Sequence, residues 1–156
     1  MDSEKISQLL VQAERNAALV DKAADTLSSY TRSRLSWQSH AGQLEVIKQH
    51  VNDLAKNGSD LADIKAEGSE WQQEAIDRII PLMNSMANHL TATIQHLNDN
   101  QSRIHMQPYR DYARGNVELS HKTLTLIRDY VDYDQARAKA DALEKKLAGS
   151  QESSGE

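Results

Sequence analysis

The stretch 71–104, WQQEAIDRIIPLMNSMANHLTATIQHLNDNQSRI, decides the fold class of this 156-residue chain. Its apolar side chains recur at alternating steps of three and four residues, which places one stripe along a helix. The stripe consists of Ile76, Ile79, Met83, Met86, Leu90 and Leu97, with Thr93 keeping the step. It is widened by Ile80, Leu82 and Ile94, so the face is too broad for a two-stranded seam. Such a face needs several other helices to cover it.

Three further stretches carry the same helical period and predict the covering helices, at 3–28, 36–66 and 108–147. Short links between the four helices imply antiparallel neighbours. The chain is therefore predicted to be all-α, an elongated antiparallel up-down-up-down four-helix bundle with coiled-coil-like packing. One domain covers 2–147, and the polar tail 148–156 has nothing to bury and is predicted to be disordered.

Two boundaries stay open in the sequence. The hydroxyl-rich segment 28–33 interrupts the apolar pattern and shifts its phase, which favours a turn, but no Gly or Pro excludes a single bent helix. Gly58 weakens the second helix by about 1 kcal/mol relative to Ala. Because the apolar phase survives across Gly58, one continuous helix is favoured over a short break.

Composition excludes several classes of function. The net charge is −5 with both signs interspersed, so the basic stripe of a nucleic-acid-binding protein is missing. The chain has no Cys, which excludes disulfides, thiolate metal sites and Cys nucleophiles. No apolar run approaches the roughly 18 residues of a transmembrane segment. Without a nucleophile elbow or a phosphate-binding Gly-rich loop, no enzyme activity is predicted.

A metal- or cofactor-binding bundle is the alternative that the histidines suggest. Glu118 and His121 form one Glu-x-x-His motif, whereas di-iron bundles use two copies together with glutamates from other helices. His121 falls between Val117 and Leu124 on an apolar row and is therefore expected to point inward. His40 lies on the apolar stripe of its helix and is expected to be a buried core residue. With one copy of the motif, we expect neither a metal nor a cofactor.

A repeated triplet is the candidate for a protein-binding surface. Arg-Asp-Tyr occurs at 110–112 and again at 128–130, and eighteen residues are five helical turns. Arg and Tyr are frequent interface anchors. The predicted interface consists of Arg110, Tyr112, Arg128 and Tyr130. The alternative is that the tyrosines line the edge of the bundle with their hydroxyls in water. A protein partner is expected, and the sequence does not specify an oligomeric state.

Four stretches, 33–54, 71–104, YRDY at 109–112 and RDYVDY at 128–133, resemble a group of small exported bacterial helical proteins. The resemblance implies an export signal upstream of the chain, and hence a periplasmic or secreted location, with a cytoplasmic location as the alternative. It carries over no functional residue. Together these observations predict a non-enzymatic interaction or structural protein of the bacterial envelope.

Overall fold

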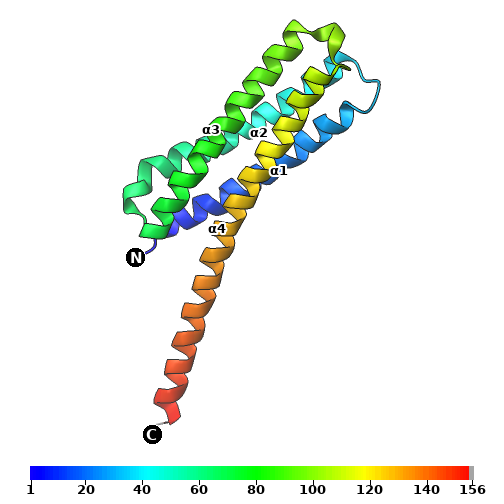
Figure 1. Ribbon diagram of the computed structural model, residues 1–156. Helices are drawn as coiled ribbons and strands as arrows, with labels where there is room; N and C mark the ends of the chain where they lie inside the picture. Colours follow the sequence, from blue (N-terminus) through cyan, green and yellow to red (C-terminus); the bar gives the residue numbers. More distant parts are fainter. Residues whose placement is uncertain (155–156) are drawn as a thin grey trace.

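Four α-helices follow one another along the chain, and a computed structural model describes residues 1–154 (Figure 1). The helices are α1 (Glu4–Tyr30), α2 (Trp37–Ile64), α3 (Glu70–Asp99) and α4 (Gln107–Ser154). Two short 3-10 turns, η1 (Lys65–Glu67) and η2 (Gln101–Arg103), precede α3 and α4. The described part of the chain contains no strand. The predicted all-α four-helix bundle is confirmed.

Serine side chains begin the first two helices. Ser3 Oγ accepts a hydrogen bond of 3.3 Å from the backbone N–H of Ile6, and Ser36 Oγ accepts one of 3.3 Å from that of Ser39. Each cap satisfies a backbone donor that has no partner inside its helix. Residues 31–34 form a turn between α1 and α2. The predicted turn is confirmed, and the chain does not form a single bent helix there.

Gly58 lies inside α2, which runs without a break to Ile64 as predicted. A Cβ atom at Gly58 would lie 2.7 Å from Met83 Sδ on α3. Glycine at this position therefore lets α2 and α3 approach each other closely. The neighbouring Asn57 is buried, and its Oδ1 accepts a hydrogen bond of 2.6 Å from Asn16 on α1.

The entry to α3 is tied to the start of α1 by one side chain. Gln72 Oε1 accepts hydrogen bonds from the backbone N–H groups of Ser69, at 3.1 Å, and Ser3, at 2.8 Å. Gln72 thus reaches back to the N-cap residue Ser69, as in a capping box. At its other end α3 stops at Asp99, five residues before the predicted limit. There Asn100 Nδ2 donates to the carbonyl of His96 at 2.9 Å and occupies a free acceptor of the last turn.

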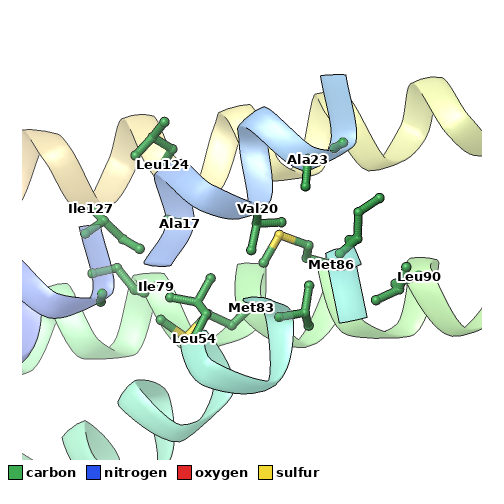
Figure 2. Packing of buried hydrophobic residues seen from close by; sticks show 14 of the residues in the cluster. Ala17, Val20, Ala23, Leu54, Ile79, Met83, Met86, Leu90, Leu124 and Ile127 are labelled. Carbon is green, nitrogen blue, oxygen red and sulfur yellow. The ribbon is translucent and has the colours of Figure 1, made fainter. Parts of the chain in front are cut away.

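Each helix packs against two neighbours: α1 against α2 and α4, and α3 against α2 and α4. This square arrangement encloses one core of aliphatic, methionine and alanine side chains (Figure 2). The stripe on 71–104 faces inward as predicted: its seven residues from Ile76 to Leu97 are buried, and the three that widen it, Ile80, Leu82 and Ile94, are half-buried. Ala17 and Ala23 on α1 keep the neighbouring helices close (Figure 2).

The fourth helix continues well past the bundle. Its last buried residue is Val131, and every residue of 135–152 is exposed. We call the part of α4 from 134 to 154 the α4 extension. In Figure 1 it is the orange and red segment that extends beyond the ends of the other three helices.

The extension departs from the sequence prediction in two ways. The helical period over 108–147 predicts a packed row that extends through Ala140, Leu143 and Leu147, but all three are exposed. The reason is that α1 begins at Glu4 and α3 at Glu70, level with the end of the buried part of α4, so no helix reaches further. In addition, residues 148–154 of the predicted disordered tail continue the helix, while 155–156 lie outside the described residues.

Candidate functional site

A groove between α3 and α4 is the first candidate binding surface. Its larger part has a volume of about 600 Å³, with a floor of Pro81, Leu82 and Leu126. A smaller part of about 320 Å³ adjoins it and reaches Trp71 and Tyr133. The two parts share Arg78, Leu126 and Asp129. We call both parts together the α3–α4 groove; it combines an apolar floor with charged rims of both signs.

Aromatic rings close the end of this groove that lies nearest to the α4 extension. Trp71 stacks on Tyr130 with ring centroids 6.4 Å apart, and Tyr133 meets Trp71 edge-on at 5.2 Å. Arg78 Nη1 donates to the Tyr130 hydroxyl at 2.9 Å. The indole Nε1 of Trp71 donates to Asp2 Oδ1 at 2.9 Å. These contacts hold the rings in fixed positions, so the groove presents a preformed aromatic surface.

Pro81 lies in the lining of the groove, inside α3. Proline has no N–H, so the carbonyl of Asp77 loses its partner in the helix while α3 continues through this point. The side chain of Asp77 forms an ion pair with Lys65, which secures the rim at the same level. The proline ring and Leu82 on α3 and Leu126 on α4 form the apolar part of the lining.

The four residues predicted to form an interface are divided between different neighbours. Tyr130 lines the groove, and Tyr112 packs on His96 of α3 with centroids 4.7 Å apart, so both tyrosines lie on the α3 side. Arg128 instead forms an ion pair of 3.5 Å with Glu14 of α1. Arg110 donates to the carbonyl of His105. The two tyrosines thus face the same side but lie at opposite ends of the bundle, the arginines have other neighbours, and a shared role in binding stays a prediction.

Glu118 and His121, the alternative metal ligands, both lie at the surface. Their side chains are 71% and 70% exposed. Glu118 lies 3.9 Å from Arg114, and His121 Nδ1 lies 3.8 Å from Asp21 Oδ1. The predicted inward orientation of His121 is wrong, because the buried side of α4 at this level is formed by Ser120 and Leu124. Within residues 1–154, no group of three or more His, Asp or Glu is arranged to hold a metal ion.

A chain of alternating tyrosine and histidine rings crosses the end of the bundle that lies opposite the α4 extension. Successive centroids lie 4.7–6.4 Å apart, within the range of aromatic contacts. All four helices contribute to the chain. In order, its members are Tyr30 of α1, His40 of α2, Tyr109 of α4, His96 of α3, Tyr112 of α4 and His89 of α3.

His40 and Tyr109 form the buried centre of this ring chain. His40 Nδ1 lies 2.9 Å from the Tyr109 hydroxyl, and both side chains are almost completely inaccessible. Burial lowers the pKa of His40 below 6.5, because it disfavours the charged imidazolium. Burial likewise raises the pKa of Tyr109 well above 10. Both rings are therefore neutral near pH 7, and the buried position predicted for His40 is confirmed.

His89 is fixed at the edge of the same chain. Its Nε2 donates to the backbone carbonyl of Tyr112 at 2.9 Å, which requires the tautomer protonated at Nε2. A Cβ atom on Gly115 would lie 2.3 Å from this nitrogen, so only glycine leaves room for the imidazole. The ring chain thus depends on close contact between α3 and α4, and it holds these two helices together.

The α4 extension is the second candidate binding surface. Leu143 is 50% exposed and Leu147 is 64% exposed, and both lie on the extension. Leu126, Tyr133, Ala140 and Leu147 follow each other at intervals of seven residues. The first two of them line the α3–α4 groove, and the last two lie on the extension. The groove and the extension therefore share one row of side chains along α4.

Comparison with protein-family models, with curated proteins and with solved structures finds no match to this chain. In the described part of the chain, no helix has the length and apolar character needed to cross a membrane.

Proposed function

We propose that the protein is a non-enzymatic interaction or structural protein of the bacterial envelope, in which α4 presents a binding surface to a protein partner. The observation that carries the proposal is the exposed row of side chains that leaves the α3–α4 groove and continues along the α4 extension. An exposed helix is marginally stable in water by itself. Burial of its exposed leucines under a partner would lower the free energy of the complex.

The surface has the composition of a protein-binding site. Tyr, Trp and Arg are enriched among residues that dominate binding energy, and Trp71, Tyr130 and Arg78 are clustered at the point where the bundle ends. Their mutual contacts leave few rotamers to be lost on binding. The two leucines of the extension supply the apolar area, and the charged rims supply orientation.

In-cell photo-crosslinking tests this function. A photoreactive amino acid replaces Leu126 in the groove or Leu147 on the extension, and the matched control replaces Asp53, which is exposed on α2 away from both surfaces. We expect discrete crosslinked species from the first two positions and none of these species from position 53. The same pattern at all three positions would contradict a binding surface on α4.

The envelope location is proposed from the resemblance to exported bacterial proteins. Fractionation of the source cells with an antibody against this protein tests it separately. We expect the protein in the periplasmic fraction or in the medium, together with a periplasmic marker. Recovery with a cytoplasmic marker would contradict the location and leave the binding surface to be decided by crosslinking.

A further inference from the structure

The α4 extension carries the pattern of a two-stranded coiled coil. Tyr133, Ala140 and Leu147 are spaced by seven residues, and Ala136 and Leu143 lie between them at the three-four step. In heptad notation the first three occupy a positions and the other two occupy d positions, which together form a seam. Every residue of 135–152 is exposed, so the described bundle leaves the seam open from Ala136 onward, whereas Tyr133 at its start contacts Trp71 and Arg137.

The seam starts at Tyr133, which borders the α3–α4 groove, and continues beyond the last buried residue of α4. Val131 is the last buried residue of α4, and by helical geometry it lies nearly opposite the seam formed by Tyr133 and Ala136. The d position that precedes Tyr133 is Asp129, whose charge ends the apolar seam where the bundle begins. A second helix can therefore approach the extension without displacing α1 or α3.

The charges beside the seam identify the partner and its direction. In a parallel pair, each g residue faces the e residue five positions further along the other helix. Between two copies of this chain, Asp132 then faces Arg137, and Lys139 faces Glu144. Both contacts join opposite charges and each occurs twice. In an antiparallel pair, g faces g and e faces e, so Lys139 would face Lys146 and repulsion would offset the attraction between Arg137 and Glu144.

From this agreement we infer that two copies of the chain associate through their α4 extensions as a parallel, in-register coiled coil. The inference goes beyond the proposed function because it names the partner as a second copy. The seam is short, and three of its positions are Ala or Tyr rather than Leu, so the dimer is weak and forms with rising concentration. The two bundles lie at the same end of the coiled coil, on either side of its axis.

Single-cysteine variants test the register, because the chain has no cysteine of its own. Under mild oxidation, Ala136→Cys and Leu147→Cys should each form a disulfide-linked dimer, since parallel helices bring the same seam position together. Lys145→Cys on the outer face is the control and should stay monomeric. When the two seam variants are mixed, we expect no mixed dimer between them. A preferred mixed dimer would mean antiparallel pairing and would overturn the inference.

Charge substitution tests the same arrangement in the uncrosslinked protein by sedimentation equilibrium. Lys139→Glu turns two attractive contacts into repulsive ones and should weaken the dimer by roughly tenfold. Adding Glu144→Lys to that variant should restore it, whereas Lys145→Glu on the outer face should have little effect. A wild-type chain that stays monomeric at the highest concentration overturns the inference. Crosslinks in cells to a different protein would then still support the proposed function, and the absence of both would contradict both.

Discussion

The two halves of α4 have similar helical patterns and opposite environments. From Tyr109 to Val131 the helix buries one side against α1 and α3, including the polar Asn116, Ser120 and Thr123. From 135 to 152 every residue is exposed, Leu143 and Leu147 among them. The difference shows that helical period alone does not determine burial. What decides it is whether the neighbouring helices are long enough to reach the residue.

The largest expected effect is a cavity in the packed half. Ile127→Ala removes a fully buried side chain from the α1–α4 contact and should lower the free energy of unfolding by about 2–5 kcal/mol. Chemical denaturation at low protein concentration measures it. A cost below that of an ordinary surface substitution would mean that this half is not packed as described.

A buried hydrogen bond in the same half gives the next effect. Asn116 Nδ2 donates to Thr93 Oγ1 at 2.8 Å and to the carbonyl of Tyr112 at 2.9 Å. Asn116→Ala leaves these acceptors without that donor and should cost about 1–3 kcal/mol. Thr125→Ala is the control, because Thr125 is exposed on the same helix. Equal denaturation midpoints for the two variants would show that the buried amide is dispensable.

The third effect depends on pH. The folded state holds the pKa of His40 below its unfolded value, so the unfolded state binds more protons in acid. Stability should therefore be complete above the unperturbed value of about 6.5 and fall as the pH drops below it. His40→Gln should remove part of this fall, and His105→Gln, at an exposed position, should not. An unchanged acid profile in the His40 variant would contradict the neutral, buried imidazole.

The smallest effect is expected in the exposed half. Leu147→Ala removes a side chain that is 64% exposed and should change the stability of the monomer by no more than about 0.5 kcal/mol. Thermal unfolding of dilute protein compares it directly with Ile127→Ala. A loss as large as that of the buried isoleucine would place Leu147 inside a core.

The sequence predicted the parts of the fold in which apolar spacing and burial agree. The stripe on α3, the buried His40 and the turn before α2 all follow from local patterns and capping residues. The end of the bundle on α4 could not be predicted in this way, because it depends on where α1 and α3 begin in space. The sequence pattern of a heptad row is the same whether or not a neighbouring helix covers that row.

The candidate site was only partly accessible to the same reasoning. The apolar row from Val117 to Leu124 predicted an inward His121 and did not indicate the buried Ser120, because small hydroxyl residues carry no apolar signal although they pack well between helices. The ring chain left a detectable signal, since His89 and His96 are seven residues apart and Tyr109 and Tyr112 are three apart. Their contact across α3 and α4 nevertheless depends on helix register, which the sequence does not give.

Hydrogen exchange along α4 tests the contrast between its two halves most directly. In dilute protein we expect strong protection of the amides from 113 to 131 and weak protection from 136 to 152, because every residue of 135–152 is exposed. Raising the protein concentration should increase protection only in the second segment, as the extensions pair. Equally strong protection of both segments in dilute protein would contradict the division of α4 into a packed half and an exposed half.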